Sequence, residues 1–265
     1  MKICPVSMSP VAPQFKAASE TARFGLIALA TDLTSEGDLY RQLPNEAASF
    51  HVTRVAFENP TTLENLRKMS PRLTAAAALL APLQPLRAIC FSCTAASVVI
   101  GESEVRAAIQ KTAGKVPVVT PASASLAAFV TLGAQRIAVL TPYTLATSKP
   151  MAAYFARHEV DVTRFECLGL DDDRNMALVS RQTIFDAAIA ADTPEAQALF
   201  LSCTSLPAIG VIADIERRVG KPVVTSNQAS AWAMARLGGF TDHRPARYGR
   251  LFEHALPAHT FGEAA

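Results

Sequence analysis

No stretch of this 265-residue chain is long and apolar enough to suggest a membrane-spanning helix. Such a helix needs roughly 18 consecutive apolar residues. The longest candidate, 73–83, is short, rich in alanine and interrupted by Pro82. Residues 1–22 also contain no continuous apolar stretch of the kind that a secretory signal requires. We therefore expect a soluble, cytoplasmic protein with no membrane partner, in which 1–22 is a loose N-terminal extension.

The chain carries no excess of charge of either sign, with 25 Lys and Arg residues against 23 Asp and Glu residues and a net charge of +2. Because nucleic-acid-binding proteins usually show a clearly basic balance or patch, we expect no nucleic-acid partner. Hydrophobic residues make up 50% of the chain and charged residues 18%. These values exclude a disordered chain, which would be less apolar and carry more uncompensated charge.

Metal and cofactor motifs are also missing. The histidines show no metal-binding spacing, and no glycine-rich motif of the dinucleotide- or phosphate-binding type occurs. We therefore expect neither a metal nor a cofactor. The cysteines are odd in number, in a chain too long to need disulfide bonds, which favours a reducing compartment. They are Cys4, Cys90, Cys93, Cys167 and Cys203.

From Arg23 onward, short apolar runs alternate with longer amphipathic stretches, a pattern typical of strands joined by crossover helices in a parallel sheet. The pattern predicts strands at 24–30, 52–57, 88–91, 117–119, 137–140, 160–165, 198–201 and 222–224. It predicts helices at 62–80, 97–113, 125–132, 145–157, 175–191, 206–219 and 230–237. Glycines that follow four of these helices are expected to end them, namely Gly114, Gly133, Gly220 and Gly238.

An internal repeat indicates two similar halves. Ser92-Cys93-Thr94 ends one predicted strand, and Ser202-Cys203-Thr204 ends another 110 positions later. Val118-Val119-Thr120 likewise recurs as Val223-Val224-Thr225, 105 positions later, and an Ala-Ser pair and a Leu-Gly pair follow in both copies. A repeat with two copies predicts an α/β fold of two pseudo-twofold-related, doubly wound lobes, each with a four-stranded parallel sheet.

The repeat also suggests where one lobe ends and the next begins. We expect lobe 1 to span 23–120 and lobe 2 to span 121–225, with 226–265 packing back to complete lobe 1. In open parallel sheets, ligands bind beyond the carboxyl ends of the strands. The sequence therefore predicts a site in the cleft between the two lobes, where both Ser-Cys-Thr segments would lie.

Two cysteines stand out at this predicted cleft. Cys93 and Cys203 each precede a helix N-terminus, whose free N–H groups and positive dipole end bind a carboxylate and lower a thiol pKa. A cysteine at the end of a buried strand is more often a small packing residue. We apply that interpretation to Cys4, Cys90 and Cys167, whereas the repeat favours a functional role for Cys93 and Cys203.

The segment 25–32, the two Ser-Cys-Thr segments and Leu140-Thr141-Pro142-Tyr143 carry a resemblance to a known family. From Arg23 to about Leu237, the chain resembles the aspartate/glutamate racemase superfamily, particularly its maleate isomerase and arylmalonate decarboxylase branch. The resemblance implies a cofactor-independent enzyme with one thiol on each face of the substrate carbon next to a carboxylate. Decarboxylases of this branch keep only the second cysteine, so the presence of both here counts against a decarboxylase.

The resemblance also implies roles for individual residues. Cys93 and Cys203 would be catalytic, as an acid and base pair or as a nucleophile and an acid. Tyr143 would hydrogen-bond a substrate carboxylate, and Thr94 and Thr204 would supply hydroxyl and backbone donors. The full set of expected substrate-binding residues is Thr31, Asp32, Thr94, Ala95, Tyr143, Asp173, Thr204 and Ser205.

Two aspartates depart from the maleate isomerase pattern. Asp32 stands where those enzymes place an asparagine after the first strand, and Asp173 corresponds to a second asparagine. A neutral amide can donate a hydrogen bond to a carboxylate, whereas an ionised aspartate repels a carboxylate and favours an ammonium group. Maleate would then fit poorly, and a substrate with one carboxylate and one cationic nitrogen would fit better.

Segments 30–36 and 59–66 resemble the ectoine-utilisation members of the superfamily more closely. This likeness implies a role in compatible-solute breakdown, with a diamino acid derivative as the ligand. The resulting hypothesis is a two-cysteine racemase or isomerase of a small, amino-group-bearing carboxylic acid. Two alternatives remain open: a maleate cis-trans isomerase and a non-catalytic module that binds small acids. The resemblance also implies a homo-oligomer, either a dimer or a tetramer.

Overall fold

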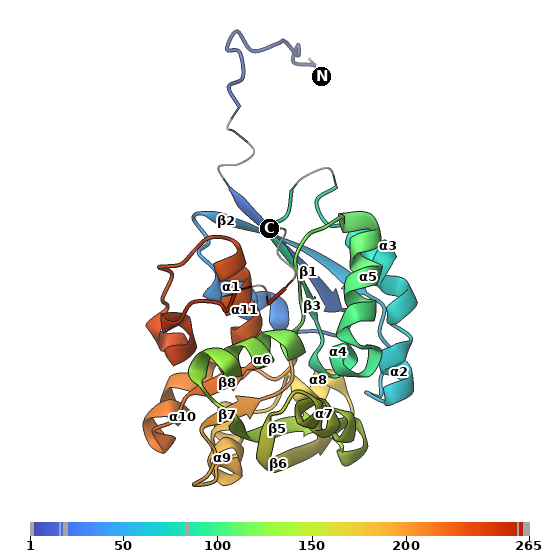
Figure 1. Cartoon of the computed structure of the whole chain (residues 1–265). Coiled ribbons are helices and arrows are strands. Elements are labelled where there is room, and N and C mark those ends of the chain that lie inside the picture. Colours follow the sequence, from blue (N-terminus) through green and yellow to red (C-terminus); the bar gives the residue numbers. More distant parts are fainter. Residues whose placement is uncertain (1–2, 16, 18–20, 83–84, 259, 262–265) are drawn as a thin grey trace.

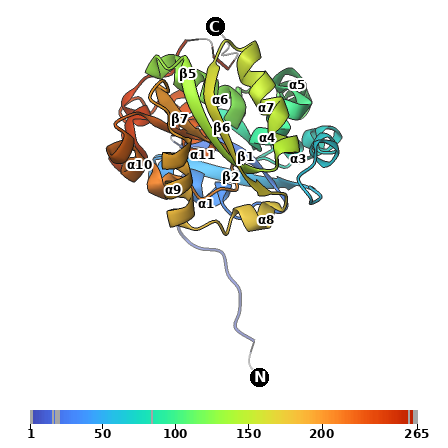
Figure 2. The same ribbon diagram turned by 90° about the horizontal axis from the view of Figure 1, so that it is seen from below.

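The computed structural model describes residues 3–15, 17, 21–82, 85–258 and 260–261. Parts of the predicted extension 1–22 and of the predicted segment 226–265 lie outside these described residues, at 1–2, 16, 18–20, 259 and 262–265. Within the described part, the chain forms two four-stranded parallel sheets, with strand orders β2-β1-β3-β4 and β6-β5-β7-β8. Figure 1 shows the first sheet above the second, and Figure 2 gives the view from below. The predicted fold class is confirmed.

All eight predicted strands are present. They are β1 (Ala22–Leu29), β2 (Ala48–Val55), β3 (Ala88–Ser92), β4 (Val118–Val119), β5 (Arg136–Tyr143), β6 (Asp161–Leu170), β7 (Ala198–Leu201) and β8 (Val223–Thr225). The central strands are apolar because helices cover both faces of a parallel sheet. The edge strands β2 and β6 are longer than predicted, since polar residues are tolerated at a sheet edge and hide the apolar pattern there.

The helices differ from the prediction in several places. The predicted helix 175–191 is divided between Met176 and Arg181, and the predicted helix 206–219 is α-helical only from Ile212. The predicted helix 62–80 is divided by a 3-10 turn that contains Pro71, the predicted helix 97–113 breaks at Gly101, and a short helix at Ser35–Gln42 was not predicted. The α-helices are α1 (Ser35–Gln42), α2 (Leu63–Arg67), α3 (Leu73–Ala78), α4 (Thr94–Ile100), α5 (Glu102–Ala113), α6 (Pro121–Leu132), α7 (Leu145–Arg157), α8 (Asp173–Met176), α9 (Arg181–Ala191), α10 (Ile212–Val219) and α11 (Ser226–Leu237). Over the described residues, none of the helices combines the length and the apolar character needed to cross a membrane.

Two helices join the halves of the molecule. α6 follows the last strand of the first sheet, yet its Phe129 packs edge-on against Phe155 of α7 and Phe200 of β7, with ring centroids 6.0 and 5.6 Å away. α11 follows the last strand of the second sheet and contacts α1 and β3 of the first. The sheet of each half is therefore followed by a helix that packs on the other half. This exchange of helices holds the carboxyl ends of β3 and β7 together.

Candidate active site

The two Ser-Cys-Thr segments lie at the carboxyl ends of β3 and β7. Cys93 is the N-cap residue of α4, and its Sγ accepts a hydrogen bond of 3.4 Å from the N–H of Ala96. The Sγ of Cys203 lies 3.9 Å from the Sδ of Met176 in α8. Both cysteines are almost completely buried, with exposed fractions of 5% and 3%. The equivalent strand ends thus present two shielded thiols.

Hydrogen bonds between the halves connect the two segments. Thr204 Oγ1 donates to the carbonyl oxygen of Ser92 at 3.2 Å, and Thr94 Oγ1 donates to Ser226 Oγ at 2.8 Å. The same Ser226 Oγ accepts the N–H of Cys203 at 3.0 Å. The hydroxyls of Thr94 and Thr204, expected to face a substrate, are engaged with protein groups here. The first N–H groups of α4, on Thr94 and Ala95, have no acceptor within the helix.

Tyr143, the last residue of β5, is buried and hydrogen-bonds the thiol of Cys203. Burial raises the pKa of Cys203 to about 12, and the nearby charge of Asp173 contributes in the same direction. The hydrogen bonds from Tyr143 and from the N–H groups of Ser205 and Leu206 oppose this rise.

The other thiol behaves in the same way. Burial raises the pKa of Cys93 well above its ordinary value, and the charges of Asp173 and Cys203 add to that rise. Because an ionised Cys203 would raise the pKa of Cys93, and both cysteines raise the pKa of the buried Tyr143, the three side chains belong to one site. Both cysteines therefore rest as neutral thiols near neutral pH.

Asp32 directs its carboxylate toward the start of α1. Its Oδ1 accepts the N–H groups of Thr34 and Ser35 at 2.7 and 2.8 Å, and its Oδ2 accepts the hydroxyl of Ser35. Burial raises the pKa of Asp32, and these hydrogen bonds oppose the rise. Asp32 therefore anchors the turn that leads into α1. Its expected contact with a substrate stays a prediction.

Asp173 is the aspartate of the 171–173 run whose charge reaches both cysteines. Its Oδ2 accepts the hydroxyl of Thr31 at 2.7 Å, and its Oδ1 accepts the hydroxyl of Ser205. Its neighbour Asp172 instead caps α8 and forms an ion pair with Arg174. The structure thus brings Thr31, Asp173 and Ser205 together beside the thiols.

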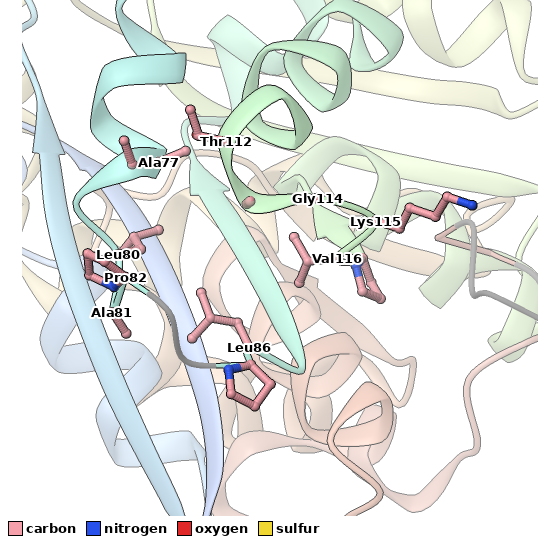
Figure 3. A pocket seen from close by; sticks show the side chains of 13 residues that line it. Ala77, Leu80, Ala81, Pro82, Leu86, Thr112, Gly114, Lys115 and Val116 are labelled. Carbon is pink, nitrogen blue, oxygen red and sulfur yellow. The ribbon is translucent and has the colours of Figure 1, made fainter. Parts of the chain in front are cut away.

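The site is enclosed, because its cysteines, Tyr143 and both aspartates are buried. The hollow in Figure 3, of about 700 Å³, lies elsewhere. It is lined by the ends of α3 and α5 and by the segments that enter β3 and β4, including Leu86 and Lys115. Since Cys93 follows the other end of β3, this hollow does not belong to the site.

Of the three cysteines that were expected to be packing residues, two are at least partly buried and one is exposed. Cys90 is buried within β3, and the thiol of the half-buried Cys167 donates to Ser148 Oγ at 3.2 Å. Cys4 is exposed, so the prediction that it packs inside the protein is wrong. Its segment, residues 3–15, is exposed and extends away from the body (Figure 1). Among the described residues, no group of three or more His, Cys, Asp or Glu side chains could hold a metal ion.

Three residues of the site were missed in the sequence. Met176 contacts Cys203, Ser226 joins the two cysteine segments, and Asn59 holds the Asp173 backbone, whose N–H it accepts at 3.1 Å. A signal for Ser226 was available. It directly follows Thr225 at the position where the first copy of the repeat has Pro121, so the two copies diverge there.

Comparison with known proteins places the chain among enzymes of one family. A sequence profile of the arylmalonate decarboxylase family matches residues 46–252. The arylmalonate decarboxylase of Bordetella bronchiseptica is 34% identical over 142 residues, which cover 52% of this chain and 59% of that protein, less than two thirds of its length. The maleate isomerase of Nocardia farcinica is 26% identical over 225 residues, covering 81% of this chain and 89% of that protein.

Solved structures agree with this placement. A variant of arylmalonate decarboxylase in its liganded form, with one glycine changed to cysteine and one cysteine to serine, has a TM-score of 0.77 at 26% identity. The match covers 88% of this chain and 99% of that one. A Nocardia farcinica maleate cis-trans isomerase variant with a covalently bound succinylcysteine intermediate has a TM-score of 0.79 at 23% identity, over 88% and 98% of the two chains. At this identity, the likeness to the maleate isomerase structure shows a shared fold.

Proposed function

Since this chain belongs to the arylmalonate decarboxylase family, we propose that it is a cofactor-independent isomerase that uses Cys93 and Cys203. The reaction takes place at the carbon next to the carboxylate of a small acid. The observation that carries this proposal is the placement of two buried thiols at equivalent strand ends, close enough to influence each other, with Tyr143 beside them. Retention of both cysteines favours isomerisation over decarboxylation.

In the proposed racemisation, protons move between two sulfur atoms and one carbon. One cysteine, ionised to its thiolate, removes the proton from the carbon next to the carboxylate. The electron pair left on carbon is delocalised into the carboxylate. The other thiol then delivers its proton to the opposite face, so that the configuration inverts and a thiolate now stands on that side. Tyr143 would hydrogen-bond the carboxylate, and the enclosed site would exclude water.

Asp173 supports a substrate that carries a cationic nitrogen. Its negative charge raises the pKa of both thiols, which hinders formation of the thiolate. An ammonium group beside Asp173 would offset that charge and make a thiol easier to ionise, whereas a second carboxylate would have the opposite effect. An amino acid therefore suits the site better than a dicarboxylate. The diamino acid derivatives of ectoine breakdown belong to this class.

Maleate cis-trans isomerisation is the second candidate, because the likeness to the Nocardia farcinica enzyme extends over most of both chains. In that reaction, one thiolate adds to a carbon of the double bond while the other thiol protonates the neighbouring carbon. Rotation about the resulting single bond, followed by loss of the same proton and of the cysteine sulfur, restores the double bond as fumarate. The intermediate would be a succinylcysteine, as in the Nocardia structure.

Solvent deuterium exchange tests the proposal. The protein is incubated in D₂O with amino acids, and deuterium at the carbon next to the carboxylate is followed by NMR. Maleate is tested in parallel by the appearance of fumarate, which NMR distinguishes from maleate. We expect exchange to be abolished in Cys93→Ser and Cys203→Ser and kept in Cys90→Ser, which changes a buried cysteine inside β3.

Two results would contradict the two-thiol mechanism. One is exchange that persists in both Cys93→Ser and Cys203→Ser. The other is tight binding of a small acid with neither deuterium exchange nor formation of fumarate from maleate, which would indicate a non-catalytic binding module. Formation of fumarate from maleate without deuterium exchange into any amino acid would support the maleate isomerase alternative.

A further inference from the structure

Cys203 has a backbone conformation that cysteine rarely adopts. Its φ is 124°, whereas its counterpart Cys93, at the end of β3, has an extended φ of −153°. A side chain at positive φ is crowded against its own backbone, and such a conformation persists only where the surroundings hold it. The two copies of the repeat therefore differ at the cysteine itself.

The group that holds the Cys203 backbone is the hydroxyl of Ser226. Ser226 Oγ accepts the N–H of Cys203 at 3.0 Å and the hydroxyl of Thr94 at 2.8 Å, which uses both acceptor positions of that oxygen. Ser226 is completely buried, so bulk water does not compete for these bonds. Because Thr94 directly follows Cys93, one hydroxyl links the amide of one cysteine to the residue beside the other.

The repeat provides an internal comparison. Ser226 is the first residue of α11, and Pro121 is the first residue of α6. Both helices have a threonine N-cap with a capping box, so the local structure is otherwise alike. Proline has no hydroxyl to offer, and the N–H of Cys93 binds the carbonyl oxygen of Phe91 at 3.1 Å instead. Of the two cysteine amides, only that of Cys203, the cysteine with positive φ, is thus bound by a hydroxyl from the first residue of such a helix.

We infer that Ser226 is a positioning residue that holds Cys203 in its left-handed conformation and thereby aims its thiol at the carbon that Cys93 approaches from the other side. This inference rests on the proposed function, in which Cys203 transfers a proton. Ser226 acts through the amide of Cys203 and through Thr94, without contact with the reacting atoms. A small error in the position of a proton-transfer group is sufficient to reduce a rate strongly.

Site-resolved alkylation of the full-length protein tests the inference without a known substrate. Iodoacetamide labelling followed by peptide mass spectrometry gives a rate for each cysteine. In Ser226→Ala we expect Cys203 to be alkylated about tenfold faster, the factor that corresponds to loss of one buried hydrogen bond. Cys93 and Cys90 should keep their wild-type rates. With a substrate identified, kcat should fall by about tenfold to a hundredfold while KM is little changed.

Matched variants separate positioning from general destabilisation. Ser125→Ala removes another buried hydroxyl, which donates to the carbonyl oxygen of Pro121 at 2.6 Å, and should leave all rates unchanged. Ser226→Thr keeps the oxygen and should keep the wild-type pattern. Ser226→Gly removes the same hydroxyl and replaces Ser226→Ala if the latter does not fold.

The inference is overturned if Cys203 keeps its alkylation rate when the Ser226 hydroxyl is removed, or if Cys90, Cys93 and Cys203 all become faster together. The second result would mean that Ser226 only stabilises the fold. A wild-type protein that exchanges no proton on any acid would overturn the proposed function. The selective change at Cys203 would then still support the positioning role.

Discussion

At the scale of single residues, the charge of Asp173 adds to the effect of burial in hindering ionisation of the two thiols. That charge contributes to the raised pKa of both Cys93 and Cys203. Asp173→Asn removes the charge and keeps nearly the same size, so we expect the pKa of both thiols to fall. The pH dependence of alkylation at each cysteine would show this as a shift of the midpoint to lower pH. Asp171→Asn, at an exposed position nearby, is the control and should not move either midpoint.

The same substitution is expected to change which substrate is used. If an ammonium group of the substrate pairs with Asp173, kcat/KM for the amino acid in Asp173→Asn should fall by about tenfold to a hundredfold, as when a hydrogen bond to a charged group is lost. Conversion of maleate, measured by NMR as the formation of fumarate, should improve because the amide no longer repels a carboxylate. A variant that loses activity on both substrates equally would contradict the proposed role of Asp173.

The cysteines could be predicted because the repeat marks them twice, and Tyr143 because a resemblance to a family identified it. Ser226 could not be predicted by periodicity, since one serine after a capping threonine is an ordinary way to begin a helix. The orientation of Asp32 was also beyond prediction. Its hydrogen-bond partners are Thr34, the N-cap residue of α1, and Ser35, the first residue of α1, and α1 itself was not predicted.

At the scale of secondary structure elements, α1 was missed because its buried face is largely polar. Of its buried residues only Leu39 is apolar, and the others are Ser35, Asp38 and Gln42. Two of these polar side chains have partners distant in the sequence. The hydroxyl of Ser92 donates to Ser35 Oγ at 2.8 Å, and Asn227 Nδ2 donates to Asp38 Oδ2 at 2.9 Å. The strands show the contrary case. Burial on both faces makes the central strands apolar, so these are easily predicted, whereas the edge strands β2 and β6 also carry polar residues and were predicted too short.

Gly238 follows α11 where a helix-ending glycine was predicted, but the structure gives a different reason for glycine at this position. A glycine that ends a helix usually has a positive φ, whereas the φ of Gly238 is −75°, a value that any residue adopts. A Cβ at this position would lie 2.4 Å from Cζ of Phe24, a core residue of β1. Gly238 is therefore required because α11 approaches the first sheet closely.

We expect Gly238→Ala to lower the free energy of unfolding by about 1–3 kcal/mol, the usual cost of overpacking a core. Urea unfolding measures this value. Gly37→Ala is the matched control, because Gly37 lies within α1, is exposed, and a Cβ there would be in ordinary contact with Arg41. It should raise the free energy of unfolding by about 0.5–1 kcal/mol. Stability unchanged in Gly238→Ala would show that β1 and α11 can separate without cost.

At the scale of the whole molecule, the two sheets and their strand content could be predicted from the repeat, but the contacts that join the halves could not. Besides the aromatic packing of Phe129, those contacts include hydrogen bonds of polar side chains that carry no sequence pattern. Asn227 of α11 is an example, because its Nδ2 donates to Asp38 Oδ2 of α1 at 2.9 Å and to the carbonyl oxygen of Thr204 at 2.8 Å. A buried carboxylate of the first half is thereby connected to the cysteine segment of the second.

This connection makes the stability of the molecule depend on pH. Burial raises the pKa of Asp38 to about 6 from an ordinary value of 3.8, although Asn227 and Arg41 oppose the rise. Between these two values, the folded protein holds the proton on Asp38 and the unfolded chain does not. Raising the pH through this window therefore favours unfolding, and the stability contributed by the protonated group is lost by about pH 6.

We expect the free energy of unfolding to fall by about 3 kcal/mol through this group as the pH rises from about 4 to 6, since each pKa unit corresponds to about 1.4 kcal/mol. Asp38→Asn cannot titrate and should remove that part of the pH dependence. Urea unfolding at several pH values between 4 and 7 measures it. Asp161→Asn, which removes an exposed carboxylate at the start of β6, should follow the wild-type curve. If Asp38→Asn also follows that curve, Asp38 is ionised in the folded protein throughout this range, and the link from α1 through Asn227 to Thr204 does not depend on its proton.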